Sequence, residues 1–149
     1  MSELKGRVAE AVKAAMRAGD KERLGALRMI SAGIKQVEVD ERRELADDDV
    51  IAILSKMVKQ RREALEAYEQ AGREDLAARE KSEIDVISEF LPQPLSDAEI
   101  DQLIDEAIAQ SGASSIKDMG KVMAGLKPKV QGRADLGQIS ARVKARLGA

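Results

Sequence analysis

The chain has 149 residues and contains neither cysteine nor histidine. These absences exclude disulfides, a cysteine nucleophile, a histidine general base and the usual zinc-binding spacings. The first residues lack the apolar core of a secretory signal, and no stretch approaches the roughly 20 apolar residues that a membrane-spanning helix needs. The sequence therefore predicts a soluble protein of the reducing cytoplasm, without a metal, a cofactor or a membrane partner.

The net charge of −2 hides an uneven distribution along the chain. Residues 115–149 contain 8 Lys and Arg against 2 Asp and Glu, whereas residues 1–114 contain 17 against 25. A basic tail behind an acidic body indicates an anionic partner that is engaged by one end only. Because Tyr68 and Phe90 are the only aromatic residues, stacking of bases is excluded, and any nucleic acid would be contacted through its phosphates or its folded shape.

Apolar residues recur every three or four positions in the long segments, and no sustained strand alternation occurs, so we expect an all-α protein. The first part should hold about four helices that pair as long antiparallel hairpins. The first helix spans about residues 2–16 and ends before Gly19, and the second helix is capped by Asp20 and runs to Arg43. The third helix follows Asp47–Asp49, and the fourth helix lies between Gly72 and Phe90.

Pro92 and Pro94 form the clearest boundary in the chain, because each removes a backbone donor and disfavours helix in the residue before it. Ser96 and Glu99 follow with the pattern of a capping box. Domains are therefore expected at residues 1–92 and 95–149. The second should be a small three-helix bundle, with helices over about 97–110, 116–126 and 136–147 and with Asp135 capping the last.

The segment from Met119 to Asp135 gathers glycines, a proline and four cations at a junction between two expected helices. On the first of these helices, Met119, Val122, Met123 and Leu126 share the core side, and Lys117 and Lys121 lie opposite. Gly120 and Gly125 each cost roughly 1 kcal/mol relative to alanine inside a helix. Close approach of another helix or of a phosphate group would compensate for that cost.

A purely structural explanation of this basic cluster stays open. Cations near a helix C-terminus interact favourably with the helix dipole, and Arg142, Lys144 and Arg146 could serve only that purpose in the last helix. Gly132 could be a simple turn residue and Asp135 only an N-cap. Residue spacing does not decide between this explanation and anion binding.

Several other charged or polar clusters have plainer explanations than chemistry. We interpret Asp47–Asp49 as a helix start rather than a cation site, and Ser114 or Ser115 as an N-cap rather than an amidase nucleophile. A second basic cluster consists of Lys56, Lys59, Arg61 and Arg62, interleaved with Glu63, Glu66 and Glu69. We interpret it as a solvated helix face with ion pairs between positions i and i+4. We interpret Glu80, Glu83 and Glu89 as an acidic outer face.

Motifs in sequence order along nearly the whole chain resemble the GatB/YqeY family, and in particular a free-standing YqeY-like protein. The stretches that carry the resemblance are Lys56–Glu63, Ala71–Leu76, Glu83–Ile84 leading to Phe90–Pro92, Met119–Met123, Pro128–Val130 and Gly132–Asp135. The last two groups are the most specific. Leu136 departs from the family pattern, which usually has glycine there, and Lys127 lies where that pattern demands no cation.

The family is similar to the tail region of the GatB subunit of the tRNA-dependent amidotransferase, in which the helical tail contacts tRNA and transamidation occurs in another domain. The resemblance therefore implies tRNA as a partner of the C-terminal domain, an amidotransferase or tRNA-synthetase assembly as a protein partner, and no autonomous catalysis. Carbon–nitrogen ligation with glutamine as amido-N-donor would be an activity of the assembly. The alternative class is a helical protein–protein interaction module built by the N-terminal helices.

Compared residue by residue, the family's motif residues correspond in this sequence to Gly120, Lys121, Pro128, Lys129, Gly132, Arg133 and Asp135. Adding the neighbouring cations, we predict that the nucleic-acid-binding residues are Lys117, Gly120, Lys121, Lys127, Lys129, Gly132 and Arg133. Lys121, Lys129 and Arg133 are expected to contact phosphates, and Gly120 and Gly132 to permit close approach. No catalytic residue and no metal ligand is predicted.

Overall fold

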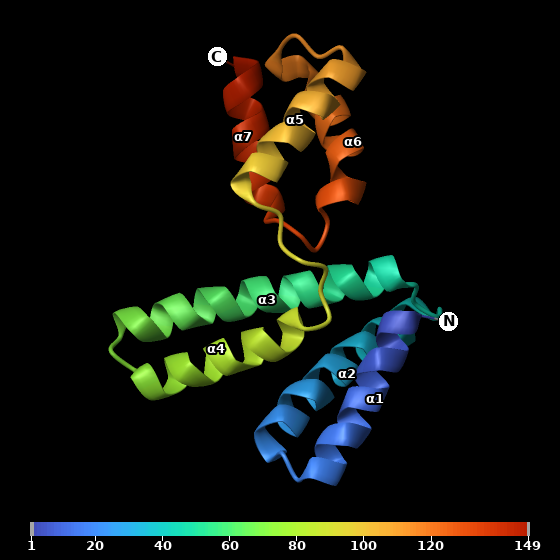
Figure 1. Ribbon diagram of the computed structural model, residues 1–149, viewed down its shortest axis with the longest axis vertical. Helices are drawn as coiled ribbons and strands as arrows, with labels where there is room; N and C mark the ends of the chain where they lie inside the picture. The colour runs from blue at the N-terminus through green and yellow to red at the C-terminus, as the bar shows by residue number, and fades with distance from the viewer. Residues whose placement is uncertain (1, 149) are drawn as a thin grey trace. The chain divides into compact units, whose positions relative to one another are not determined.

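The computed structural model describes residues 2–148, and within that range it contains α-helices and one 3₁₀ turn but no strand (Figure 1). The all-α prediction is confirmed. The chain divides into two compact units, Met1–Leu91 and Pro92–Ala149, which are described separately below.

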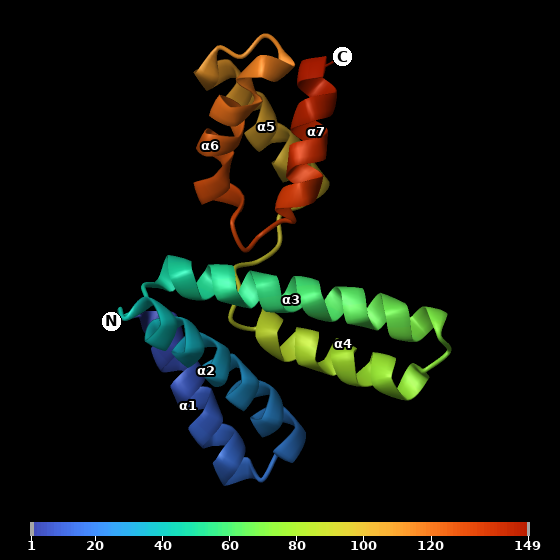
Figure 2. The same ribbon diagram turned by 180° about the vertical axis from the view of Figure 1, so that it is seen from behind.

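The N-terminal unit consists of four helices, α1 (Glu3–Ala18), α2 (Lys21–Glu41), α3 (Asp47–Gln70) and α4 (Glu74–Ser88). Helices α1 and α2 pair as one antiparallel hairpin and α3 and α4 as another (Figures 1 and 2), as the sequence predicts. The fully buried side chains of this unit are aliphatic, and the largest are Leu27, Ile30, Ile34, Leu45, Leu54 and Ile87.

The ends of the first two helices lie close to where the sequence predicts them. Gly19 ends α1 with a φ of +68°, a left-handed conformation that glycine adopts at little cost. The Asp20 carboxylate then accepts a hydrogen bond from the Arg23 amide at 3.1 Å and so caps α2. Helix α2 ends at Glu41, two residues before the predicted position.

The acidic triplet ties two helix starts together, which confirms that it is a capping element. Asp47 accepts hydrogen bonds from the Ser2 hydroxyl and, at 3.1 Å, from the Leu4 amide at the start of α1. The Asp49 carboxylate accepts a hydrogen bond from the Ala46 amide at 2.9 Å and two more from the terminal nitrogens of Arg43 at 2.9 and 3.0 Å.

The basic cluster of α3 is organised differently from the prediction. Arg61 forms ion pairs with Glu80, at 3.2 Å, and with Glu83 on α4, and only 17% of its side chain is exposed. The expected i to i+4 pairing is therefore wrong for Arg61, and the expected acidic outer face is wrong for Glu80 and Glu83. The reason is that Arg61 lies seven residues from Leu54, on the side of α3 that faces the core.

The C-terminal unit is the predicted three-helix bundle, formed by α5 (Asp97–Ser111), α6 (Met119–Val130) and α7 (Leu136–Gly148). The capping box at the start of α5 is confirmed, since the Glu99 amide donates to Ser96 Oγ at 3.1 Å and the Ser96 amide donates to Glu99 Oε1 at 3.2 Å. The buried core side chains are Ile100, Ile104, Ala107, Val122, Leu126, Val130, Ile139 and Val143.

Helix α6 begins and ends later than predicted. Residues Ile116–Asp118 form a 3₁₀ turn, in which Ser115 makes no side-chain capping bond and the Ser114 amide instead donates to Asp118 at 3.1 Å. At the other end the helix continues through the exposed Pro128 to Val130. Burial of Val130, four residues beyond Leu126, offsets the hydrogen bond that the proline removes.

Replacement of Arg61 by alanine is expected to lower the free energy of unfolding by about 2 kcal/mol, because Glu80 then loses its charged donor and Glu83 keeps only the exposed Arg79 at 3.6 Å. Arg62→Ala removes the neighbouring exposed cation and should change stability by less than about 0.5 kcal/mol. Urea unfolding of both variants measures the difference. Equal losses would show that the α3–α4 ion pairs do not stabilise the fold.

The contribution of Asp49 should depend on pH. The Arg43 guanidinium and the Ala46 amide lower the pKa of Asp49 to about 2, whereas an unfolded aspartate titrates near pH 4. A lowered pKa stabilises the fold above the unfolded value, and that stability is lost as the pH falls from about 4 to about 2. The stability difference between the protein and Asp49→Asn should be constant from pH 5 to 7 and vanish near pH 2.

Asp48→Asn is the matched control for that experiment, because it removes an exposed carboxylate from the same helix end. A pH-dependent difference as large for Asp48→Asn as for Asp49→Asn would contradict a specific role of the Arg43–Asp49–Ala46 contacts.

Candidate nucleic-acid interface

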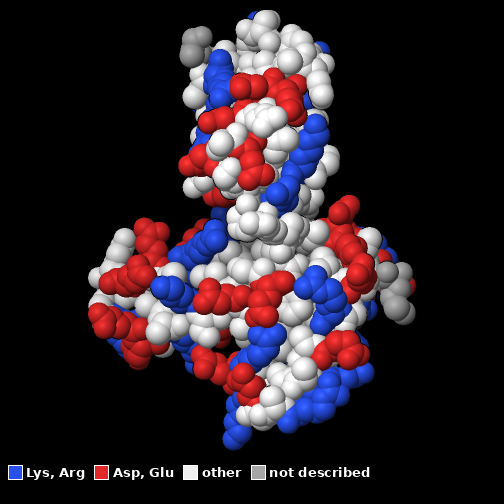
Figure 3. All heavy atoms as spheres, viewed as in Figure 1, with Lys and Arg blue, Asp and Glu red and all other residues white. Residues whose placement is uncertain are grey.

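The arginines of α7 are partnered within the C-terminal unit. Arg142 contacts Asp97 at 2.6 Å and Asp101 at 3.5 Å, and Arg146 contacts Asp101 at 3.5 Å and also pairs with Asp105. These contacts correct the interpretation that the α7 cations act only on their own helix dipole. In Figure 3 the C-terminal unit shows acidic side chains over α5 with basic side chains at the margins of that surface.

Arg133 also has partners inside the unit. Its Nε donates to the Gln93 carbonyl at 2.9 Å, and its own carbonyl accepts the Leu95 amide at 2.9 Å. The guanidinium is close enough to Glu99 to help the Ser96 backbone and side chain lower the pKa of that carboxyl. Arg133 therefore fastens the segment that enters α5 to the turn between α6 and α7.

The rest of the Gly132–Asp135 motif builds the same turn. Gly132 has a φ of +76°, a left-handed conformation that suits glycine, and Ala134 packs against the core. The Asp135 carboxylate accepts a hydrogen bond from the Gly137 amide at 2.9 Å and so caps the start of α7. Gly132 and Arg133, which the sequence offers for phosphate binding, thus each have a structural role in this turn. Sequence reasoning missed the Arg133–Gln93 bond, although Gln93 lies between two prolines, where its carbonyl has no helical partner.

The lysines of the unit are arranged differently from its arginines. Lys117, Lys121, Lys127 and Lys129 are all exposed, and within residues 2–148 none of them has a carboxylate at ion-pair distance. Lys121, Gly125 and Lys129 follow one another at four-residue intervals, so they form a row about 12 Å long on one side of α6. Lys117 precedes this row in the 3₁₀ turn.

The structure does not group all four predicted lysines. Lys127 is two residues from Lys129, a rotation of about 200° around the helix, and therefore points to the opposite flank of α6. The lysine row is defined here as Lys117, Lys121 and Lys129, with Gly125 between the last two.

Two glycines leave the surface of α6 open. A Cβ atom at Gly120 or Gly125 would have no neighbouring atom within 4 Å, so close approach of another helix does not explain either glycine. Within residues 2–148 no neighbouring atom therefore compensates for the helix cost of these two glycines.

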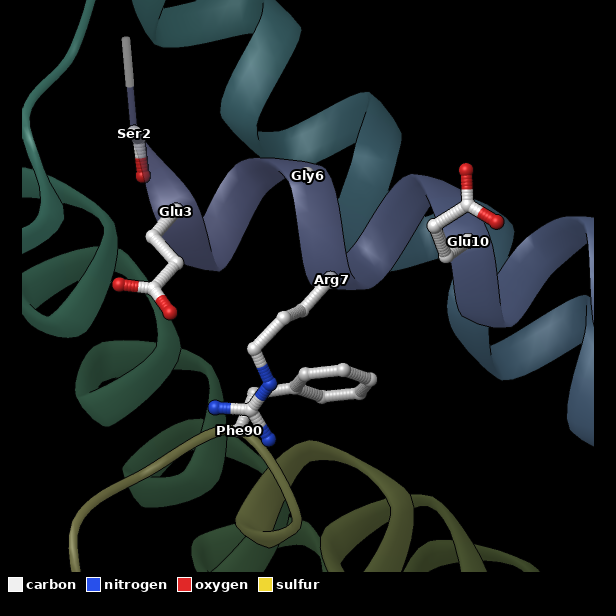
Figure 4. Close-up of a pocket in the computed structure, with 6 residues that line it drawn as sticks. All are labelled: Ser2, Glu3, Gly6, Arg7, Glu10 and Phe90. Atoms are coloured by element: carbon white, nitrogen blue, oxygen red, sulfur yellow. The ribbon is translucent and has the colours of Figure 1, made fainter.

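The N-terminal unit has a shallow hollow beside the start of α1, lined by Ser2, Glu3, Gly6, Arg7, Glu10 and Phe90 (Figure 4). The Arg7 guanidinium lies 5.6 Å from the centre of the Phe90 ring, and its Nη2 donates to the Glu89 carbonyl at 3.3 Å. The arginine in this hollow is therefore held by contacts that stabilise the fold.

Neither a metal-binding cluster nor a membrane-spanning helix is found within residues 2–148. No group of three or more Asp and Glu side chains there is arranged to hold a metal ion. None of the helices in that range combines the length and the apolar character needed to cross a membrane.

Comparison with known proteins identifies fungal relatives along much of the chain. "Altered inheritance of mitochondria protein 41, mitochondrial" from Pyrenophora tritici-repentis is 26% identical over 141 residues, which cover 93% of this chain and 77% of that protein. The proteins of the same name from Lachancea thermotolerans and Saccharomyces cerevisiae are 35% and 31% identical over 102 and 129 residues. Those alignments cover 66% and 86% of this chain, but only 54% and 65% of the relatives.

The names of these relatives contradict the cytoplasmic location that the sequence predicts, because they describe mitochondrial proteins. That prediction rested on the missing apolar signal core and the missing cysteine. Neither feature reports on this question, since mitochondrial targeting segments are amphipathic and Arg-rich rather than apolar.

The family prediction, in contrast, is confirmed. Residues 5–147 match the family described as Yqey-like protein, so the match includes all seven α-helices in whole or in large part. The chain belongs to the YqeY-like family.

Proposed function

We propose that the C-terminal unit binds the sugar–phosphate backbone of RNA, and of tRNA in particular, through the lysine row of α6. The observation that carries this proposal is the different use of the two kinds of cation in the tail. Arg133, Arg142 and Arg146 have partners within the unit, whereas the lysine row is exposed and has no carboxylate at ion-pair distance within residues 2–148.

The chemistry of the row suits phosphate better than bases. A lysine ammonium is a compact charge on a flexible stem, and it can follow a phosphate group without a fixed geometry. The described part of the C-terminal unit contains no aromatic residue on which a base could stack. Contacts of this type position an RNA without reading its sequence, so shape would provide selectivity.

The other predicted residues receive different roles in this proposal. Gly125 would let a phosphate approach the helix backbone within the lysine row, while Gly132 and Arg133 would hold the turn that orients α6. Gly120 lies seven residues before Lys127, and therefore on the flank of α6 that carries Lys127, outside the row. Lys127 faces the opposite flank and would contribute only through its long-range charge.

The resemblance to the tail of GatB supports tRNA as the RNA and an amidotransferase assembly as the setting. Under this proposal the chain would hold tRNA, and glutamine-dependent carbon–nitrogen ligation would be performed by partner subunits. Co-purification with amidotransferase subunits under mild conditions tests this part separately.

The lysine row is tested by salt-dependent binding of bulk tRNA to the intact protein and to the triple variant Lys117→Ala, Lys121→Ala, Lys129→Ala. Loss of three phosphate contacts should reduce the log–log salt slope by roughly two to three units and weaken binding. The control variant, Lys56→Ala, Lys59→Ala, Lys81→Ala, removes the same charge from exposed positions of α3 and α4 and should keep the slope.

Two results would contradict the proposal. One is an absence of tRNA binding by the intact protein near physiological salt, and the other is an equal loss of slope in both triple variants. The second result would mean that net charge alone governs the interaction.

Gly125→Ala is expected to separate stability from binding. Because the added Cβ meets open space, the variant should gain roughly 0.5–1 kcal/mol of stability, while a phosphate at the lysine row would be held off and affinity for tRNA reduced. Gly25→Ala in α2 is the control, since it also adds a Cβ to open space within a helix and should stabilise without altering affinity. Unchanged affinity in Gly125→Ala would show that RNA does not approach the helix there.

A further inference from the structure

The carboxylates of α5 form a row of their own, at the edge where α5 meets α7. Asp97, Asp101 and Asp105 are spaced by four residues, and so lie on one side of the helix. Asp101 bridges Arg142 and Arg146, each at 3.5 Å, while Asp97 and Asp105 each pair with one of them. This set is called the α5–α7 ladder below.

The ladder is too exposed to be explained by stability. The side chains of Asp97, Asp101 and Asp105 are 84%, 52% and 65% exposed, and those of Arg142 and Arg146 are 33% and 35% exposed. Exposed ion pairs of this kind contribute little to folding, because water screens both charges and the long side chains lose freedom. The ladder nevertheless places a carboxylate against each of the two α7 arginines at the surface of the unit.

A phosphate group that approaches Arg142 or Arg146 must compete with carboxylates already in contact with those arginines. The approach to the lysine row carries no such penalty, since no carboxylate pairs with those lysines within residues 2–148. The two edges of the unit thus present opposite electrostatic conditions to RNA.

We infer that Asp97, Asp101 and Asp105 restrict RNA to the α6 side of the C-terminal unit by withholding the α7 arginines from phosphate. This inference rests on the proposed function and adds to it a specificity element that opposes the wrong docking of RNA. The α5 carboxylates are positioning residues in this arrangement, because they act through Arg142 and Arg146 and touch no RNA themselves.

The test replaces Asp97, Asp101 and Asp105 by asparagine, which keeps the shapes of the side chains and removes every ladder carboxylate from both arginines. Tighter tRNA binding is expected, together with a salt slope that is steeper by about 0.7 to 0.9 for each arginine that gains a phosphate contact. The matched control, Glu63→Gln, Glu66→Gln, Glu69→Gln, removes three charges from exposed residues of α3 and should leave the slope unchanged.

A second arm introduces the three asparagines into the variant Arg142→Gln, Arg146→Gln. There the aspartates have no arginine to withhold, so the gain in affinity and slope should disappear, and comparison of the two backgrounds isolates the coupling. Circular dichroism checks that all variants keep their helix content.

The outcomes distinguish the two proposals. Lysine-dependent tRNA binding without a steeper slope in the triple asparagine variant, or a gain that persists without the arginines, would overturn the inference and leave the proposed function intact. An intact protein that binds no tRNA would overturn the proposed function and the inference with it.

Discussion

Burial of one aliphatic stripe on each helix is the constraint on which both units depend. The chain has no cysteine and only two aromatic residues, so Leu, Ile and Val provide nearly all of the core volume. In α6 this constraint is visible in detail. Val122, Leu126 and Val130 continue the stripe through Pro128, and their burial turns the opposite side of the helix, which carries Lys121 and Gly125, to the solvent. The proposed RNA contact surface follows from the packing of the core beneath it.

Arginine and lysine side chains have different roles in this protein. Arginine has a rigid fork of donors that suits a fixed oxygen, and Arg43, Arg61, Arg133 and Arg142 each hold carboxylates or a carbonyl of their own unit. Lysine is a mobile point charge, and the lysines of the C-terminal unit form no ion pair within residues 2–148. The number of Lys and Arg residues in the tail therefore overstates the positive charge that is available to an anion, because carboxylates of α5 pair with two of the arginines.

Helix periodicity predicted the elements well, because an amphipathic stripe is a local property that each segment carries by itself. The same reasoning found the caps at Asp20, Ser96 and Asp135, whose partners lie two or three residues away. It failed where the partner is distant. Arg61 meets α4 rather than the glutamates of its own helix. It also failed at one short-range contact, because the Ser114 amide donates to Asp118 and neither Ser114 nor Ser115 forms the predicted side-chain cap. The cytoplasmic location failed for another reason, since composition does not encode a compartment.

By itself the sequence determined the helical class, the capping box at Ser96, the family and the concentration of cations near the C-terminus, because each of these depends on residue types at short spacing. Only the tertiary structure decided which cations are committed to intramolecular partners. The Arg133–Gln93 bond spans 40 positions and the Arg142–Asp97 pair spans 45, and no local pattern specifies contacts of that range. Packing of the helices against a common core brings those groups together, and it leaves the lysine row as the exposed basic surface of α6.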